Sequence, residues 1–482
     1  MTSRGRRLCL ILLSLAFVAG ERSATAGLPS SAVAPTGHGS AAKQSLQKPT
    51  TPREMFAALG VGDAYFHRLA DGRQLQPGEK ESLWRILFRL RLFPAIDMDR
   101  WALDQSKLGE ALARPNDFRG SIFRLHGRIV SVEPCKPPAD AAQRFELPEY
   151  FRCRLKLDAP NAIADVYTEN VPEAWKKGAK PNAPGGALAT FLKIADKGGQ
   201  QPCVVFAAPR LAWHPDNLLG TLGMDVGLLD AVRDQKPITP QETDAFYGLL
   251  AAVGRAKPGE LLRKAEADLP HAPAAWRWTT PKGDERYSVA PLFNEPAAQR
   301  GRLIDLYGVA RRVEEVRIAD PALVARFGFD HYYQVLIFTD DSYDENSNQN
   351  PLTFCVRELP KGMPVGNTPR YGETVRIAGF FFKTWSYHVP KATDPSLTPN
   401  PKTHRQLSPL LIGRDLTWYP EAKPAEDLPI DAIVSVLFCL LAVFVLALAW
   451  RSRGRRRWKH QVVEEPRDLD SIIKLDDRDD AP

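Results

Sequence analysis

Two distant stretches of this 482-residue chain align with each other without a gap. Residues 59 to 90 and residues 222 to 253 match at a constant offset of 163 positions. The identical pairs are Leu59 and Leu222, Gly60 and Gly223, Asp71 and Asp234, Pro77 and Pro240, Glu79 and Glu242, and Leu87 and Leu250. Self-similarity at a fixed spacing is typical of a repeated structural unit. The sequence therefore predicts two tandem copies of one unit.

Both copies predict a short helix, a turn and a second, amphipathic helix. Gln76 or Thr239 precedes a Pro at the first helical position, and a Glu follows two residues after that Pro. Leu83, Leu87 and Leu90 in one copy, and Phe246, Leu250 and Val253 in the other, fall on one helical face.

A long strand is predicted next in each copy. "RGSIFRLHGRIVSVEP" (119 to 134) and "RGRLIDLYGVARRVEEV" (300 to 316) share Arg-Gly, an alternating apolar pattern and a central Gly, now at an offset of 181. Alternation is the spacing of a strand, and a Gly inside a strand indicates a bulge or sharp bend. Gly127 and Gly308 occupy that position.

Four further strands follow in the same order. In the first copy they are residues 150 to 158, 165 to 172, 187 to 195 and 203 to 215, and in the second copy 332 to 340, 354 to 360, 373 to 385 and 408 to 420. The last strands end in "RLAWHP" and "DLTWYP", which share Leu, Trp and Pro at the same relative positions. These two phrases therefore mark domain ends.

A helical segment followed by five strands, the first of them long and bent at a Gly, resembles the OB-fold, a partly open five-stranded barrel. The resemblance covers residues 119 to 215 and 300 to 420, and a small β-sandwich or an SH3-like barrel remains open. The expected fold class is α+β, with a first repeat at 53 to 216 (helices 53 to 113, barrel 119 to 215). The second repeat is expected at 217 to 420 (helices 222 to 268, barrel 300 to 420).

The two ends of the chain predict export and a membrane anchor. Residues 1 to 26 have the pattern of a secretory signal peptide, and residues 27 to 52 form a low-complexity linker. After a Pro-rich stalk (421 to 431), residues 432 to 450 carry no charge over a length that predicts a transmembrane helix. The Arg-rich start of residues 451 to 482 predicts a cytoplasmic tail, with the N-terminus outside the cell membrane.

The charge does not call for a nucleic-acid partner. The whole chain has 64 Lys and Arg against 57 Asp and Glu, a net charge of +7. The part expected to be exported, residues 27 to 428, keeps 51 basic and 47 acidic residues, or +4. Such a mild excess is far from the basic surface that nucleic-acid binding requires.

The sequence contains no familiar catalytic or cofactor motif. It has no GxSxG elbow, HExxH helix, phosphate-binding Gly loop or CxxC pair. His67, His126 and His214 align with Asp230, Tyr307 and Tyr419 in the other copy, so the sequence does not favour a His-based site shared by the repeats. We therefore expect a non-enzymatic protein without a cofactor, although a site peculiar to one copy stays open.

Two segments have residues suited to binding. Asp340, Asp341, Asp344 and Glu345 concentrate oxygen ligands that suit calcium, but lack the EF-hand spacing and suit a solvated hairpin loop better. Trp385, Tyr387 and His388 follow three phenylalanines and are candidate ligand-binding residues on a stacking face. About half of an alternating strand faces the core in any case, so core packing is the alternative.

Cys135 and Cys153 are expected near facing ends of two neighbouring strands and form a candidate disulfide, or are two small buried residues.

Together these observations predict a single-pass, membrane-anchored binding or scaffold protein of the cell envelope, with a protein or envelope polymer as partner. The alternatives are an envelope enzyme with a site between the two units, and an OB-type binder of polysaccharide or nucleic acid. The oligomeric state is not indicated.

Overall fold

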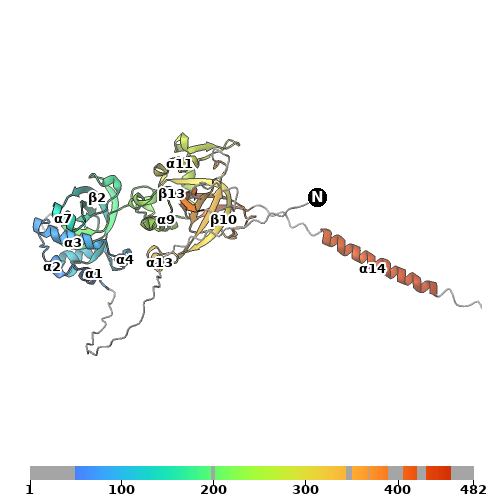
Figure 1. Cartoon of the computed structure of the whole chain (residues 1–482), viewed down its shortest axis with the longest axis horizontal. Helices are drawn as coiled ribbons and strands as arrows, with labels where there is room; N and C mark the ends of the chain where they lie inside the picture. Colours follow the sequence, from blue (N-terminus) through green and yellow to red (C-terminus); the bar gives the residue numbers. More distant parts are fainter. Residues whose placement is uncertain are drawn as a thin grey trace, which may run out of the picture. The chain divides into compact units, whose positions relative to one another are not determined.

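The computed structural model describes residues 49–196, 201–342, 350–368, 370–388, 405–420 and 430–457. The described residues up to Pro420 belong to one compact unit, and the C-terminal helix belongs to a second. The first unit contains two sheet-forming bodies, coloured blue to green and green to orange in Figure 1. The α+β class predicted from the sequence is confirmed.

Short helices and one long strand open the first repeat. Its helical segments, with η for 3-10 helices, are α1 (Pro52–Ala58), α2 (Asp63–His67), η1 (Pro77–Glu79), α3 (Lys80–Leu90), α4 (Ala95–Trp101), η2 (Gln105–Lys107), α5 (Leu108–Ala113), α6 (Pro115–Phe118), α7 (Ala139–Arg144) and η3 (Glu173–Trp175). Its strands are β1 (Leu103–Asp104), β2 (Ile122–Cys135), β3 (Tyr150–Leu157), β4 (Ala162–Thr168), β5 (Ala183–Asp196), β6 (Cys203–Ala208) and β7 (Ala212–Trp213).

The second repeat follows the same plan with additional elements before its long strand. Its helical segments are α8 (Leu218–Thr221), η4 (Val226–Ala231), η5 (Pro240–Glu242), α9 (Thr243–Gly254), α10 (Glu260–Asp268), η6 (Leu269–His271), η7 (Ala274–Trp276), α11 (Ala290–Asn294), α12 (Pro296–Gln299) and α13 (Pro321–Phe327). Its strands are β8 (Arg277–Thr279), β9 (Glu285–Tyr287), β10 (Leu303–Arg317), β11 (His331–Phe338), β12 (Leu352–Val356), β13 (Glu373–His388), β14 (Arg405–Gly413) and β15 (Leu416–Tyr419).

The helix starts have the capping chemistry that the sequence indicates. Gln76 and Glu79 form a capping box at η1, with Pro77 at the first helical position, and Thr239 and Glu242 do the same at η5. A capping box satisfies backbone donors that a helix start otherwise leaves free. The apolar faces of α3 and α9 that follow are buried.

The strands of each repeat are hydrogen-bonded in a ring. In the first repeat the order is β2-β3-β4-β6-β5, and β5 pairs again with β2. In the second repeat the order is β10-β11-β12-β14-β13, and β13 pairs again with β10. The ring pairings are antiparallel except β4 with β6 and β12 with β14. Both sheets are therefore compatible with barrel-like domains and share one strand order.

Gly127 of β2 and Gly308 of β10 lie where the backbone of the next strand, β3 or β11, comes close to the long strand. A Cβ at Gly127 would stand 2.4 Å from the carbonyl oxygen of Lys156, and one at Gly308 would stand 2.3 Å from that of Phe338. The register of the ladder shifts just beyond, after Ile129 in β2 and after Ala310 in β10. The bulge predicted from the two glycines is thus present.

The predicted fifth strand is two strands in each repeat. β6 and β14 complete the ring, while β7 and β15, formed by the Trp-containing phrases, pair only with β5 and β13. Trp418 donates its indole N–H to Glu373 at 2.7 Å, and Trp213 packs against Trp175 with ring centroids 5.0 Å apart. The phrases close the domains as short edge strands.

Apolar side chains fill both the interior of the rings and the face under the helices. In the first repeat Phe123, Phe191 and Phe206 are fully buried inside the ring and lie within 6.2 Å of one another by ring centroids. Leu192, the residue after Phe191, belongs instead to the cluster under α3. Alternation along β5 therefore supplies both cores.

The expectation of a transmembrane helix at residues 432 to 450 is wrong. The segment belongs to helix α14 (Ile430–Arg457), whose described side chains from Val436 to Trp450 are apolar and exposed. Within the part of the chain that the structure describes, no helix has the length and apolarity needed to cross a membrane.

Candidate ligand-binding pocket

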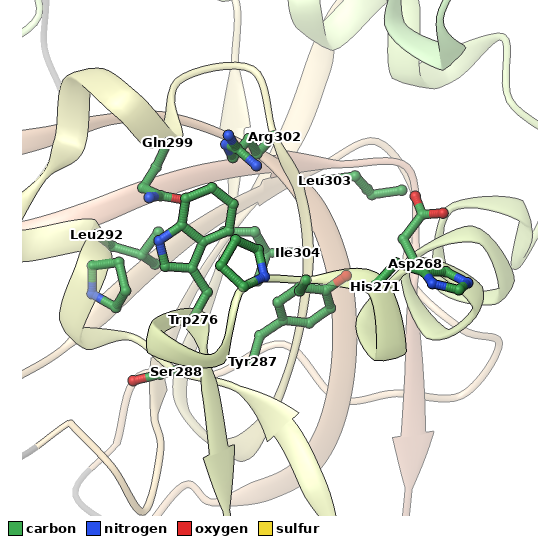
Figure 2. Close-up of a pocket in the computed structure, with 13 residues that line it drawn as sticks. Asp268, His271, Trp276, Tyr287, Ser288, Leu292, Gln299, Arg302, Leu303 and Ile304 are labelled. Carbon is green, nitrogen blue, oxygen red and sulfur yellow. The ribbon is translucent and has the colours of Figure 1, made fainter.

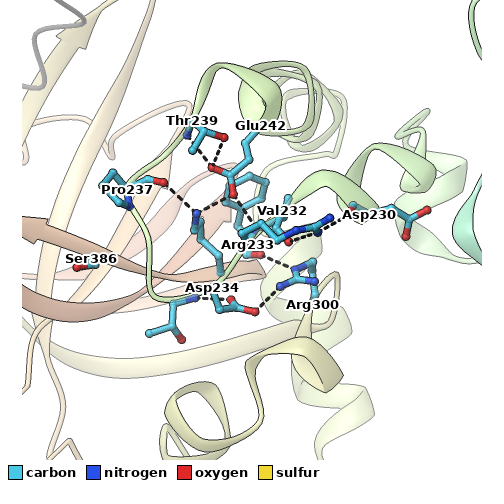
Figure 3. A network of polar contacts seen from close by, with 12 residues as sticks. Asp230, Val232, Arg233, Asp234, Pro237, Thr239, Glu242, Arg300 and Ser386 are labelled. Atoms are coloured by element: carbon cyan, nitrogen blue, oxygen red, sulfur yellow. Dashed lines mark hydrogen bonds and ion pairs between the residues drawn. The ribbon is translucent and has the colours of Figure 1, made fainter. Parts of the chain in front are cut away.

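A buried ion pair occurs at the same place in both repeats. In the second, the Lys383 ammonium on β13 lies 2.7 Å from the Glu242 carboxylate at the end of η5, and neither side chain is exposed to solvent (Figure 3). In the first, Lys193 on β5 lies 2.7 Å from Glu79 of η1, with 0% and 5% of the side chains exposed. Each pair ties a strand to the helical segment.

Backbone donors complete the coordination of each glutamate. Glu242 accepts hydrogen bonds from the N–H groups of Arg233 at 2.8 Å and Thr239 at 2.7 Å. Burial opposes ionisation of Glu242, but the hydrogen bonds from Lys383 and these N–H groups outweigh it and lower the pKa of the carboxyl. The equivalent donors to Glu79 are Ala70 and Gln76.

A second ion pair accompanies each of these. Arg300 donates to Asp234, which also accepts the N–H of Thr384 at 3.1 Å (Figure 3). The counterpart in the first repeat is Arg119 with Asp71, which accepts the N–H of Ile194 at 2.8 Å. Because each of these charges has its partner, this network is a structural support and leaves no group free for a ligand.

A cavity of about 320 Å³ lies in the second repeat (Figure 2). This volume is within the roughly 300–1,000 Å³ of small-molecule sites. Its apolar lining includes the buried side chains Tyr287, Leu292 and Ile304 and the half-buried indole of Trp276.

An insertion builds one side of this cavity. The offset between the repeats grows from 163 at the helices to 181 at the long strand, and the structure places η6, η7, β8 and β9 in this region. The offset of 181 maps α6 onto α12, both of which begin with Pro, and the residues before them, Arg114 and Glu295, share a φ of −132°. The cavity lies between the inserted segment and these shared elements.

Smaller side chains on the shared elements leave the space open. At an offset of 181, Phe118 and Phe123 of the first repeat correspond to Gln299 and Ile304. The two phenylalanine rings pack with centroids 6.1 Å apart, whereas Gln299 and Ile304 line the cavity. The first repeat therefore fills with rings the position where the second repeat keeps a pocket.

Gln299 and Arg302 line the cavity, and each has N–H groups with no acceptor among the described residues. Gln299 is 2% exposed, and its Nε2 makes no hydrogen bond to any described residue. Arg302 lies over the Trp276 ring, 3.7 Å from guanidinium carbon to ring centroid, and its Nε donates to the Ala298 carbonyl at 3.0 Å. Arg302 is an exposed residue whose partial desolvation lowers the pKa of its guanidinium, and no described carboxylate pairs with it.

The remaining polar residues do not form a catalytic set. Asp268, His271 and Ser288 line the same cavity, but within the described ranges no hydrogen bond joins them. The hydroxyl of Ser288 accepts the N–H of Ala290 at 3.3 Å and lies beside the Asp341 carboxyl. Tyr287 donates its hydroxyl to the Ala265 carbonyl at 3.1 Å, and burial raises its pKa to about 12. The geometry suits binding.

The aromatic residues proposed as a stacking face pack against the core. Trp385 is 6% exposed, and its ring lies 5.1 Å from that of Tyr387. Burial raises the pKa of Tyr387 to about 12. His388 ends β13, and its side chain lies outside the described part. Trp385 and Tyr387 thus do not form an exposed face for stacking.

The acidic segment is described only in part. The Asp341 carboxylate accepts the N–H of Val289 at 2.9 Å and the hydroxyl of Thr339 at 3.0 Å, while Asp340 is exposed. Asp344 and Glu345 lie outside the described residues. Among the described residues no group of His, Cys, Asp and Glu is arranged to hold a metal ion.

The candidate disulfide is not formed. Cys135 and Cys153 are both free thiols. The register places Cys135 opposite Tyr150 and Cys153 opposite Val132, so the two cysteines occupy different rungs of the ladder. Burial raises the pKa of both thiols.

Comparison with known proteins identifies no family. No family model and no curated protein matches the chain. Among solved structures, a putative aspartyl-tRNA synthetase from Leishmania major Friedlin is similar at 12% identity, covering 49% of this chain and 46% of that one, with a TM-score of 0.15. The chain thus spans a little under half of that protein's length. A similarity this low carries no argument, so function has to be inferred from the site.

Proposed function

We propose that this protein is a non-catalytic binding protein. Its second repeat holds a small organic molecule, or the end of a peptide chain, in the cavity beside Trp276. The first repeat serves as the scaffold. The observation that carries this proposal is the repeat-specific cavity: an insertion and two smaller side chains open space at a position where the first repeat packs Phe118 against Phe123.

The composition of the pocket supports binding over catalysis. Binding sites are mostly apolar with a few placed polar groups, which describes Trp276, Leu292 and Ile304 beside Gln299 and Arg302. Catalysis by a nucleophile requires a base within hydrogen-bond reach. Within the described residues Ser288 makes no hydrogen bond to Asp268 or His271, the acidic and basic side chains of the same cavity.

We further propose that the protein acts outside the cytoplasm, because residues 1 to 26 have the pattern of a signal peptide. The two strand rings support an assignment as OB-type barrels as part of the same proposal.

Binding of a small neutral probe tests the proposal. 3-Phenylpropanamide has an apolar ring and an amide, and at roughly 0.3 kcal/mol per non-hydrogen atom it should bind full-length protein with a Kd in the low millimolar range. Saturation-transfer NMR detects such binding directly.

The repeats provide matched variants for this titration. Gln299→Phe introduces the residue of the first repeat and should abolish binding by filling the cavity, and Trp276→Ala should weaken it. Phe118→Leu changes the equivalent position of the first repeat and should leave binding unchanged. The proposal fails if wild-type protein does not bind the probe, or if folded Gln299→Phe protein binds it equally well.

A further inference from the structure

The N–H groups of Gln299 and Arg302 that lack an acceptor restrict the kind of ligand that the cavity can hold. Building on the proposed binding function, we infer that the ligand carries a carboxylate that is bound by Arg302 and Gln299, with an apolar body lying on Trp276, Leu292 and Ile304. The carboxylate belongs either to a free small acid or to the C-terminus of a peptide.

Arg302 is held in a fixed orientation but is not neutralised. Its guanidinium stacks 3.7 Å from the centroid of Trp276, and its Nε is used by the Ala298 carbonyl. Within the described residues its two terminal nitrogens have no acceptor and no carboxylate pairs with it. A planar guanidinium presents its terminal N–H groups as a fork that matches a carboxylate. Stacking on an indole fixes the plane of that fork before a ligand arrives.

Gln299 adds a donor that the protein itself does not use. Gln299 is only 2% exposed, and its Nε2 lacks a hydrogen-bond partner among the described residues. Buried donors are nearly always satisfied in folded proteins. In Figure 2 the Gln299 amide lies against the Trp276 ring, with Arg302 beyond the same ring. We place the ligand carboxylate at this end of the cavity, beside both residues.

The other charges around the cavity determine how the ligand lies. Asp268 and His271, from the end of α10 and from η6, stand apart from Gln299 in Figure 2. Repulsion by Asp268 disfavours a ligand carboxylate at that end. The apolar body then extends over Leu292 and Ile304 toward Tyr287, whose hydroxyl is occupied by the Ala265 carbonyl.

The first repeat has neither donor at the equivalent positions. At an offset of 181, Ser121 corresponds to Arg302 and Phe118 to Gln299. The residues that would recognise the carboxylate are therefore specific to the repeat that has the cavity, whereas the structural ion pairs are present in both repeats.

Matched acids and amides test this inference. 3-Phenylpropanoate and 3-phenylpropanamide differ only in the charged group, as do the tripeptide Ala-Ala-Phe and its C-terminal amide. We expect each acid that fits to bind full-length protein about tenfold more tightly than its amide, because a charge-assisted hydrogen bond is stronger than a neutral one. The pair with the higher affinity identifies the source of the carboxylate.

Arg302→Ser, which introduces the residue of the first repeat, should reduce binding of the acid to the level of its amide and leave the amide's affinity almost unchanged. Lys282→Ser removes the same charge from an exposed position of the β8–β9 hairpin and should leave the preference intact. Gln299→Leu should weaken both probes, since each presents an acceptor.

The outcomes separate the two proposals. Equal binding of acid and amide to wild-type protein, or an acid preference that survives in Arg302→Ser, overturns the carboxylate inference alone. Absence of binding by all four probes overturns the proposed function as well.

Discussion

Replacing Lys383 by Met should destabilise the second repeat strongly, although the two side chains are similar in length. The substitution leaves the Glu242 carboxylate fully buried without its counter-ion. Removing one partner of a buried pair costs about 3–5 kcal/mol. Glu242 retains the backbone N–H donors of Arg233 and Thr239, so we expect the lower end of this range, about 3 kcal/mol.

Replacing the other partner, Glu242, should destabilise the second repeat even more. Glu242→Leu leaves the ammonium of Lys383 buried with only the Pro237 carbonyl at 3.3 Å, and it also removes the acceptor of two backbone N–H groups. An unsatisfied buried donor costs about 1 kcal/mol or more, which brings the expected loss to about 5 kcal/mol. The double variant Glu242→Leu/Lys383→Met removes both charges and should lose less than the two single variants added together.

Thermal unfolding of the full-length protein measures these changes. For a repeat of this size each kcal/mol shifts Tm by about 2–4 °C, so Lys383→Met should lower the Tm of one transition by about 6–12 °C. Lys193→Met makes the equivalent change in the first repeat. Lys282→Met, at an exposed position, should change stability by less than about 0.5 kcal/mol. The reasoning is refuted if Lys383→Met costs less than about 1 kcal/mol, or if Glu242→Leu is the milder variant.

Three further predictions follow from the same structure. The pKa values of Glu79 and Glu242 are lowered in the folded protein. The stability that these carboxylates contribute is therefore present above the ordinary pKa of 4.5 and is lost as pH falls through the lowered pKa. Thermal unfolding measured between pH 7 and pH 3 should show this loss of stability, and the loss should be smaller in Glu242→Gln. Gly308→Ala should destabilise by about 2 kcal/mol or more in urea unfolding because its Cβ meets a backbone oxygen at 2.3 Å, whereas Gly78→Ala, with nothing within 4 Å, should be nearly neutral. Cys355 is buried, and burial raises the pKa of its thiol, so it should react with Ellman's reagent only after unfolding; labelling at the native rate of an exposed thiol would contradict its placement.

The local elements could be predicted because their signals lie within a few residues of each other. Pro77 and Pro240 mark the helix starts, since a capping box spans only four residues. Gly127 and Gly308 mark the bulges, because a glycine inside an alternating pattern indicates close approach of another backbone.

The functions of single polar residues could not be assigned in the same way. Asp71 and Glu79 are conspicuous as matched positions, but the lysines that pair with Glu79 and Glu242 lie 114 and 141 residues further along the chain. The sequence does contain a sign that the two lysines are equivalent, since Lys193 and Lys383 each lie two residues after the matched Phe191 and Phe381. Only the strand ring shows that these lysines point toward η1 and η5.

The aromatic residues at the end of β13 show that residue type alone does not predict exposure. Trp385 and Tyr387 are candidates for an exposed face by residue type, and alternation cannot tell which face of β13 is covered. The structure buries Trp385, while Trp276, which the sequence does not distinguish from other tryptophans, lines the cavity.

The sequence by itself determined the α+β class, the repeated order of elements and the positions of the bent strands, because capping, alternation and glycine placement are local properties. The tertiary structure decided where a ligand can be held. The cavity exists because an inserted segment lies against α11, α12 and β10 of the second repeat, where Gln299 and Ile304 replace two phenylalanines. Space of that kind depends on which side chains meet across the fold, and spacing along the chain does not report it.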